Sequence, residues 1–218
     1  MGSDTWHTTT LYYDDRGRVI QTVSDNRLGG LSRTDMQYDF TGNLTHQRES
    51  HGKTGGSADV LESVNTYDAQ GRLLTQSVSL NGGTAATLTY SYDALGRLIG
   101  KRYGSTEESL TYNVRGWLTG KESTPFRMRL RYAIPEGGSG ARWNGSLSEW
   151  EWQHGTNAAM MYGLTYDGLN RFTGAVQKQK NGNTWSALSG DYVEKGLTYD
   201  RNGNLLTLQR TAGGSVVD

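Results

Sequence analysis

The sequence predicts an all-β protein, a long, curved or spiralling antiparallel sheet of tandem β-hairpins with about 14–16 strands. A short phrase of the form Tyr-Asp-x-x-Gly-Arg-Leu occurs seven times, for example as YDAQGRL from Tyr67 and YDALGRL from Tyr92. Apolar residues alternate with polar ones on both sides of each phrase, which is the period of a strand. No convincing helical pattern interrupts these copies.

Each phrase has the chemistry of a three-residue hairpin loop. Asp favours the first corner of a type I turn, because its carboxylate accepts a backbone N–H two residues later. The glycine three residues after it suits a position that needs positive φ. Two copies differ, with Asn113 in the Asp position and Asn170 in the Gly position, and Asn tolerates both roles. The predicted turn residues are Asp14 and Gly17, Asp39 and Gly42, Asp68 and Gly71, Asp93 and Gly96, Asn113 and Gly116, Asp167 and Asn170, and Asp200 and Gly203.

A loop of this length fixes which residues face each other. Each Tyr should lie opposite the apolar residue six positions later, which gives an aromatic–aliphatic cross-strand pair. The predicted pairs are Tyr13 with Val19, Tyr38 with Leu44, Tyr67 with Leu73, Tyr92 with Leu98, Tyr112 with Leu118, Tyr166 with Phe172, and Tyr199 with Leu205. Asp and Arg, as in Asp68 and Arg72, are expected on the opposite face as an exposed pair worth about 0–1 kcal/mol.

Residues 1–5 are predicted to be an expression-tag remnant or disordered, and residues 6–218 a single domain of these repeats. The repeat turns are expected near residues 14–17, 39–42, 68–71, 93–96, 113–116, 144–145, 167–170 and 200–203. A degenerate copy starts at Arg129, with a glycine-rich loop from Pro135 to Gly140 and then a hairpin about Asn144-Gly145. The stretch HGKTGGSAD from His51 is expected to be the longest flexible loop.

Composition excludes several classes of protein. The 22 basic and 22 acidic residues give zero formal net charge, which argues against nucleic-acid binding or membrane-surface binding by bulk charge. Cysteine is absent, so neither a disulfide framework nor a thiolate metal site is available. No apolar run is long enough for a membrane-spanning helix, and no signal peptide is recognisable.

The phrases YDALGRL, YDAQGRL, YDRNGNLL and LTYDGLNRFTG resemble the RHS repeats, also called YD repeats, from Leu11 to about Leu208. The family includes bacterial polymorphic toxins, insecticidal toxin complexes and teneurins. The resemblance implies a sheet that spirals into a shell around a C-terminal cargo, within a secreted or cell-surface parent protein. The Asp-Pro core motif of self-cleaving relatives is not found, and eight or nine repeats are too few to close a complete shell, so part of a shell wall is expected. The implied partners are the rest of the parent RHS protein and its cargo.

The residues indicate no catalytic, cofactor-binding or metal site, and the protein is predicted not to be an enzyme. The stretch Asp200–Asn204 lacks the spacing and the distal Glu of a calcium loop. The histidines are scattered. The predicted function is therefore a non-enzymatic structural module, part of a shell wall that encloses or displays cargo.

Aromatic residues leave an alternative open. Trp143, Trp150 and Trp152 are candidate stacking platforms for a carbohydrate or a partner protein, although packing of the sheet also explains them. Open terminal strands additionally allow edge-to-edge self-association.

Overall fold

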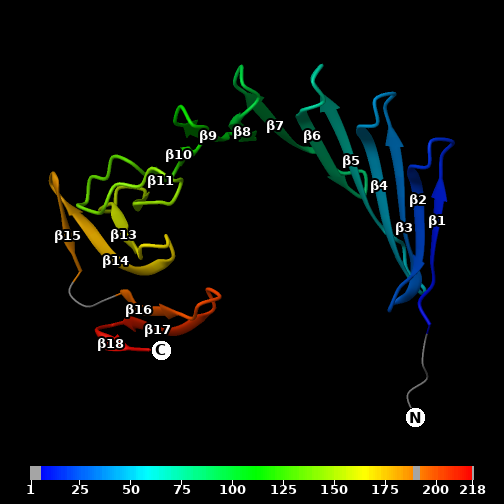
Figure 1. The fold of residues 1–218 in the computed structure, drawn as a ribbon. Helices are drawn as coiled ribbons and strands as arrows, with labels where there is room; N and C mark the ends of the chain where they lie inside the picture. Colours follow the sequence, from blue (N-terminus) through cyan, green and yellow to red (C-terminus); the bar gives the residue numbers. More distant parts are fainter. Residues whose placement is uncertain (1–5, 189–191, 218) are drawn as a thin grey trace, which may run out of the picture. The chain divides into compact units, whose positions relative to one another are not determined.

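The computed structural model describes residues 6–188 and 192–217, and within them it contains eighteen β-strands and no helix. The strands belong to one 18-stranded sheet, and every pair is antiparallel (Figure 1). The predicted fold class is thereby confirmed. The strand number exceeds the prediction, in part because the β10–β11 hairpin turns at Thr124-Pro125 without a turn glycine.

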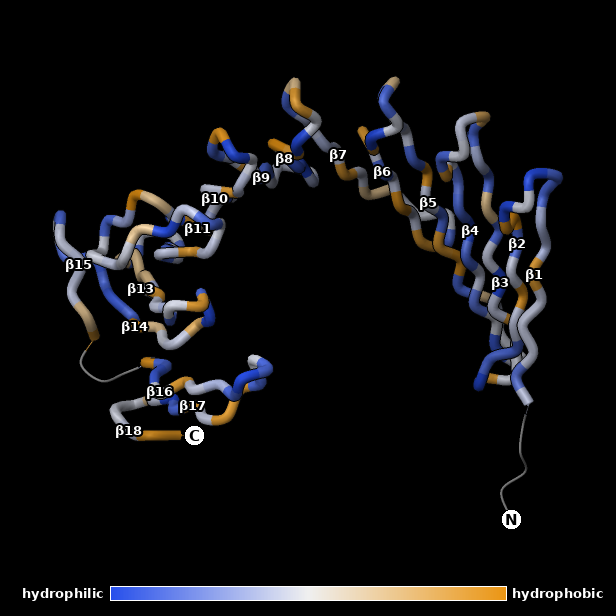
Figure 2. The backbone as a smooth tube through the Cα atoms, in the orientation of Figure 1, coloured by the Kyte–Doolittle hydropathy of each residue, from blue (hydrophilic) through white to orange (hydrophobic). Residues whose placement is uncertain are grey.

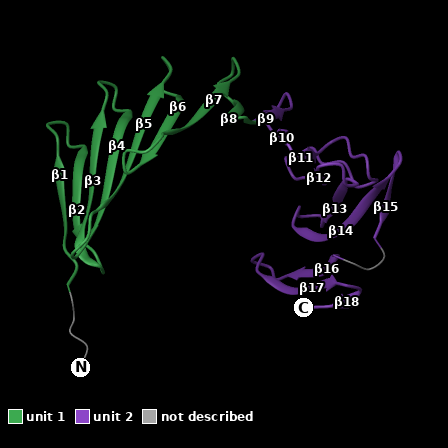
Figure 3. Cartoon of the chain, turned by 180° about the vertical axis from the view of Figure 1, so that it is seen from behind, with its two compact units in different colours: residues 1–107 green, residues 108–218 purple. Residues whose placement is uncertain are grey.

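Two compact units divide the chain, residues 1–107 and residues 108–218 (Figure 3). The sequence predicts one domain over residues 6–218, whereas contacts cluster within these two units, and each unit is described by itself below. The prediction for residues 1–5 lies outside the described residues.

The first unit contains eight strands, each paired with the next in sequence. They are β1 (Thr9–Tyr13), β2 (Val19–Asp25), β3 (Gly29–Tyr38), β4 (Leu44–Lys53), β5 (Asp59–Tyr67), β6 (Leu73–Leu80), β7 (Ala86–Tyr92) and β8 (Leu98–Tyr103). The return turns contain Gly29, Gly82 and Gly104, each with positive φ. The loop predicted from His51 is shorter than expected, because β4 continues to Lys53.

The hairpins have the predicted register. Tyr67 pairs with Leu73 and Tyr92 with Leu98, and the same spacing holds at the other five copies. The loop residue is left-handed in every copy: Gly96 has φ of 81° and Asn170 has φ of 60°. Asn170 therefore adopts the same left-handed backbone conformation that Gly adopts in the other six loops.

The second unit is less regular. Its strands are β9 (Thr106–Tyr112), which begins just before the unit boundary, β10 (Leu118–Ser123), β11 (Phe126–Arg131), β12 (Glu149–His154), β13 (Met160–Tyr166), β14 (Phe172–Asn181), β15 (Thr184–Ala187), β16 (Glu194–Tyr199), β17 (Leu205–Ala212) and β18 (Ser215–Val216). Strand β14 pairs with β13, β15 and β16.

The predicted hairpin about Asn144-Gly145 is wrong. Strand β11 pairs directly with β12, and residues 132–148 form the long loop between them. The reason is the Glu149 carboxylate, which accepts backbone N–H groups of Glu136, Gly137 and Ser139 at 2.7, 2.8 and 3.2 Å. These bonds hold the loop against the start of β12, so no strand forms ahead of Asn144.

Buried side chains occur in the second unit only, as far as the described residues go. They surround strands β12 to β14, where Met161, Glu149 and Ser148 are the largest fully buried side chains. In residues 6–107 no residue is buried, and polar and apolar residues alternate along the strands (Figure 2). The first unit is therefore a sheet with water on both faces.

Candidate functional site

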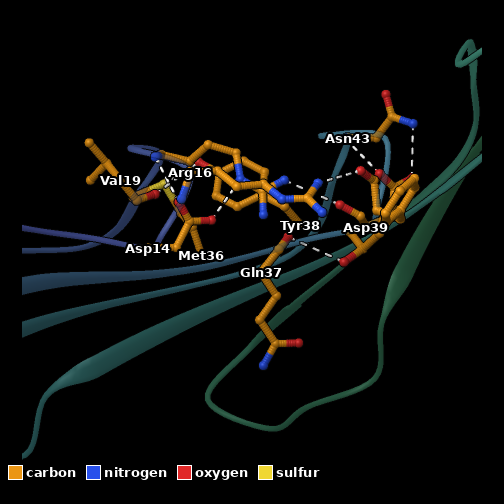
Figure 4. A network of polar contacts seen from close by, with 11 residues as sticks. Asp14, Arg16, Val19, Met36, Gln37, Tyr38, Asp39 and Asn43 are labelled. Carbon is orange, nitrogen blue, oxygen red and sulfur yellow. Dashed lines mark hydrogen bonds and ion pairs between the residues drawn. The ribbon is translucent and has the colours of Figure 1, made fainter.

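Within each unit a polar network joins neighbouring YD hairpins, and we call it the turn clamp. It consists of the turn Asp, the residue four positions later and the Tyr of the following repeat. In the first clamp, the Asp14 Oδ1 atom accepts the backbone N–H groups of Arg16 and Arg18, both at 2.9 Å. The Asp14 Oδ2 atom accepts the Arg18 Nε–H at 2.7 Å. Figure 4 shows the surrounding network, with Asp14, Tyr38 and Asp39 labelled. The carboxylate thus closes its own loop and orients the arginine.

That arginine then contacts the next repeat. The Arg18 guanidinium lies 4.8 Å from the centroid of the Tyr38 ring, and its Nη1 donates to the Asp39 carbonyl at 3.2 Å. The Tyr38 hydroxyl donates back to the Val19 carbonyl at 3.0 Å. One repeat therefore supplies both a cation for the ring and an acceptor for the hydroxyl of the next tyrosine.

The tyrosine bond recurs along both units. Each hydroxyl donates to the carbonyl of an apolar residue in the preceding repeat, from Tyr67 to Leu44 at 2.8 Å, Tyr92 to Leu73 at 2.9 Å, Tyr132 to Leu118 at 2.8 Å, Tyr166 to Leu147 at 2.9 Å, and Tyr199 to Phe172 at 2.5 Å. We call this series the tyrosine ladder. Sequence alternation predicted the faces of these tyrosines but not their hydroxyl acceptors.

The Asp–Arg pair is more than the exposed surface pair that the sequence predicts. Arg72 lies 4.8 Å from the Tyr92 ring and Arg171 lies 4.8 Å from the Tyr199 ring. The sequence predicted that the arginines lie on the face opposite the tyrosines, and this prediction is wrong for their guanidinium groups. The bulge beside each Tyr breaks strict alternation, so the arginine reaches the neighbouring ring.

In two clamps another residue stands in the arginine position. Asn43 replaces the arginine, and its Nδ2 donates to the Asp39 Oδ2 atom at 2.9 Å. Trp117 also stands in the arginine position, and its ring centroid lies 5.0 Å from that of Tyr132. The tryptophan therefore replaces a cation–π contact by an aromatic pair, while Asn43 retains only the bond to the carboxylate.

The turn carboxylates are held in the ionised form. The pKa of Asp39 is lowered to about 2, chiefly by hydrogen bonds from the Thr41 hydroxyl and the Asn43 side chain. The backbone N–H of the residue four positions later is the largest cause that lowers the pKa of Asp14, Asp68, Asp93 and Asp167. The Asn204 side chain does the same for Asp200. These carboxylates act as acceptors in the turns, which is a structural use of charge.

A cavity opens in the second unit beside the loop of residues 132–148. Its volume is about 530 Å³, and aromatic and apolar side chains line most of it, including Trp117, Tyr132, Ile134 and Trp143. The Arg115 guanidinium lies 5.1 Å from the Trp117 ring and 5.9 Å from the Trp143 ring, and its Nη1 donates to the Trp143 carbonyl. Trp143 is 64% exposed, so its ring is accessible at this cavity.

The three tryptophans singled out in the sequence do not form one group. Trp150 and Trp152 lie together on β12, with ring centroids 5.4 Å apart, and the Tyr162 ring lies 5.3 Å from Trp152. Trp143 instead lines the cavity with Trp117. The signal for Trp117 was its position, since it replaces the clamp arginine beside the next aromatic ring.

No cluster of three or more His, Asp or Glu side chains in the described chain could hold a metal ion. His51 Nδ1 is 2.8 Å from the Ser32 Oγ atom on the adjacent strand, a contact between exposed side chains that no sequence pattern indicated. No helix long and apolar enough to cross a membrane exists in residues 6–188 and 192–217.

Comparisons with known proteins agree with the repeated clamp. A family model described as RHS Repeat matches residues 67–108, which contain the hairpins at Tyr67 and Tyr92. Residues 67–108 therefore match the RHS repeat that the sequence motifs resemble. No curated protein matches its sequence.

The fold of this chain occurs in solved structures. It is similar to the crystal structure of TcdB2-TccC3 without its hypervariable C-terminal region, with a TM-score of 0.66 and 18% identity over 94% of the chain. The TcdB2-TccC3 structure itself matches with a TM-score of 0.62 and 16% identity, again over 94% of the chain. The chain spans 11% and 12% of those proteins, and at these identities the likeness shows the fold alone.

Proposed function

We propose that the protein is a non-enzymatic structural module that forms part of a β-shell wall around, or displaying, a cargo. The observation that supports this most is the tyrosine ladder, because within each unit it ties successive hairpins together by side-chain contacts. The described side chains are used in turns and junctions, and their ionised carboxylates already accept hydrogen bonds within their own loops. A wall needs continuity between neighbours more than it needs a reactive centre.

The proposal also extends to the partners and the location of the parent protein. The partners are the rest of the parent RHS protein and its C-terminal cargo, and the parent is secreted or displayed at the cell surface. Support comes from the RHS repeats and from the similarity to TcdB2-TccC3. No cofactor has a part in this function.

A protease-protection experiment on the full-length protein that contains this segment tests containment. Tyr92→Ala removes a ladder hydroxyl and the ring beneath Arg72, so cleavage of the cargo region should speed up several-fold. Leu95→Ala is the matched control, since Leu95 lies exposed at the tip of the same hairpin. Equal cleavage of the cargo region in the wild type and in a denatured sample would contradict containment.

A second candidate function is the binding of a carbohydrate or a partner protein, and the aromatic cavity favours it. Exposed Trp143 beside Trp117 and Tyr132 offers ring faces next to charged groups such as Glu136 and Arg115. Titration of the protein with a panel of oligosaccharides, followed by tryptophan fluorescence, tests it. Saturable change that Trp143→Ala abolishes and Trp185→Phe retains would support this function, whereas no saturable change with any sugar would remove carbohydrate from it.

A further inference from the structure

The aromatic cavity of the second unit lies where the repeat departs from its pattern twice. In the first clamp Arg18 lies against the ring of the next tyrosine, whereas Trp117 stands in the arginine position at this cavity. The loop of residues 132–148 then takes the place of the next hairpin and contributes Tyr132 and Trp143 to the lining. A ring has thus replaced a clamp arginine, and the cavity of about 530 Å³ has a largely apolar and aromatic lining.

Arg115 is held in a fixed position at this cavity. Its guanidinium lies 5.1 Å from the Trp117 ring and 5.9 Å from the Trp143 ring, and its Nη1 donates to the Trp143 carbonyl. The first unit has the same arrangement, because Arg16 lies 4.8 Å from the Phe40 ring and donates to the Phe40 carbonyl at 2.8 Å. A guanidinium carries several N–H donors in one plane, so most of those of Arg115 remain for another acceptor.

Arg115 is also the cation of the lining that has no counter-charge among the described residues. The other charged side chains of the lining are all in ion pairs, Arg129 with Glu122, and Arg131 with Glu136 at 2.7 Å and Glu151 at 2.6 Å. Arg115 itself forms no ion pair in residues 6–188 and 192–217. The cavity therefore combines an apolar lining with a single positive group that lacks a partner, which is complementary to an anion with an apolar body.

The surroundings of the cavity favour a small molecule over a peptide. Its volume of about 530 Å³ falls within the range of roughly 300–1,000 Å³ that small-molecule sites have. A peptide that binds to a sheet usually adds a strand to a free edge. Strands β10 and β11, which supply part of the lining, are each paired on both edges. A ligand that has no backbone of its own needs no such edge.

We propose that this cavity binds a small molecule that carries one carboxylate on an apolar or aromatic body. The body packs against Trp117, Tyr132 and Trp143, and the carboxylate accepts the Nε–H and Nη2–H of Arg115. These two donors lie side by side in the guanidinium plane and match the two oxygens of a carboxylate. The apolar lining strengthens this pair, because it removes water from around the charges. Such a ligand goes beyond the shell-wall function, and it is neither the carbohydrate nor the partner protein considered above.

Isothermal titration calorimetry with naphthaleneacetate tests the site, because this probe has two fused rings and one carboxylate. It should bind saturably, with one site per chain. Naphthaleneacetamide has the same shape without the charge and should bind about tenfold more weakly or worse. Acetate has no apolar body and should give no saturable heat. Equal affinity for the acid and the amide would overturn the proposal, and so would the absence of saturable binding of the acid.

Arg115→Gln separates the charge from the apolar lining. It should weaken the binding of naphthaleneacetate about tenfold to hundredfold, because the charged hydrogen bonds are lost. Its affinity for naphthaleneacetamide should stay unchanged, which also checks that the cavity is intact. Arg16→Gln is the matched control, since it removes the equivalent arginine beside Phe40 in the first unit, and it should change neither affinity.

An Arg115→Gln variant that binds the acid as tightly as the wild type would refute the assignment of the carboxylate to Arg115. The comparison of acid and amide on the wild type needs no variant, so it decides the proposal even if this variant unfolds.

A peptide end is the alternative occupant, and N-acetylglycyl-tryptophan, which has a free carboxylate beside an indole ring, is its probe. If this dipeptide binds about tenfold more tightly than naphthaleneacetate, the small-molecule occupant is wrong and a peptide end takes its place. If it binds no more tightly, the small molecule stands. Protease protection of the cargo region does not depend on a ligand in this cavity, so failure of the site leaves containment standing and can be told apart from it.

Discussion

The two units contain the same YD hairpin but differ in what they bury. In residues 6–107 the repeats follow one another without interruption, and no side chain is buried. In the second unit one repeat is replaced by the loop of residues 132–148, and buried side chains gather beneath it around β12 to β14. The comparison shows that the uninterrupted repeats form a sheet that is solvated on both faces and has no buried side chain. A core appears only where the repeat is interrupted.

The largest expected effect falls on the loop that covers this core. Glu149→Ala removes the acceptor of three backbone N–H groups, so unfolding of the second unit should become easier by about 4 kcal/mol. Guanidinium titration followed by tryptophan fluorescence measures it, because Trp150 and Trp152 lie on the same strand. Glu149→Gln keeps one acceptor oxygen and should lose less. Equal stability of Glu149→Ala and the wild type would remove the carboxylate as the cause of the loop.

Truncation of a methionine in each unit tests the difference in burial directly. Met161→Ala should cost about 3 kcal/mol, since Met161 is fully buried and truncation leaves a cavity. Met36→Ala in the first unit should cost about 1 kcal/mol or less, because that side chain is only half-buried. Thermal melts of both variants give the comparison. Equal losses would mean that the first unit has a core that its exposure does not reveal.

A turn substitution has the next smaller effect. Gly96→Val forces a β-branched residue to φ of 81° and brings its Cβ to 3.3 Å from Arg72 Nη1, so a loss of about 1–2 kcal/mol is expected. Gly96→Asn is the control, because Asn170 already occupies the same loop position. Denaturant midpoints of the two variants measure the difference. A Val variant as stable as the Asn variant would contradict the left-handed turn.

The smallest effect concerns acid. A carboxylate whose pKa is lowered on folding stabilises the fold fully above its unfolded pKa, and that contribution is lost as pH falls toward the folded value. For Asp39 this window runs from the ordinary 3.8 down to about 2. The first unit holds four such turn carboxylates and the second holds two, Asp167 and Asp200. Amide hydrogen exchange should therefore show an earlier loss of protection in residues 6–107 between pH 4 and pH 2.

Asp39→Asn supplies the control for this experiment. It places at one loop the residue that Asn113 already provides at another, and it should make that hairpin insensitive to pH. Uniform loss of protection across both units would break the link between turn carboxylates and acid sensitivity.

Sequence reasoning reached the parts of the fold that local chemistry decides. The turn at Tyr92 required only Asp and Gly at a fixed spacing, and the loop length then fixed the pairing of Tyr92 with Leu98. The junction between repeats was not accessible in this way. Arg72 of one hairpin contacts the ring of Tyr92 in the next hairpin. The bulge that directs the arginine there is a feature of the folded backbone, and residue alternation does not reveal it.

The irregular region shows where such reasoning fails. Asn144-Gly145 has the composition of a two-residue hairpin turn, but the buried Glu149 holds the preceding loop and overrides that local preference. A glutamate next to Trp150 in an alternating stretch looks like a solvent-facing strand position. Its burial depends on a loop of residues 132–148 that has no periodic signal.

The direction of the tyrosine ladder bears on how the protein is made. Every hydroxyl donates to a carbonyl that lies earlier in the sequence, as Tyr92 does to Leu73. During synthesis the amino-terminal part leaves the ribosome first, so the docking surface for each new hairpin is present before that hairpin emerges. The sheet can then grow one hairpin at a time as the chain leaves the ribosome, with no need to wait for distant segments.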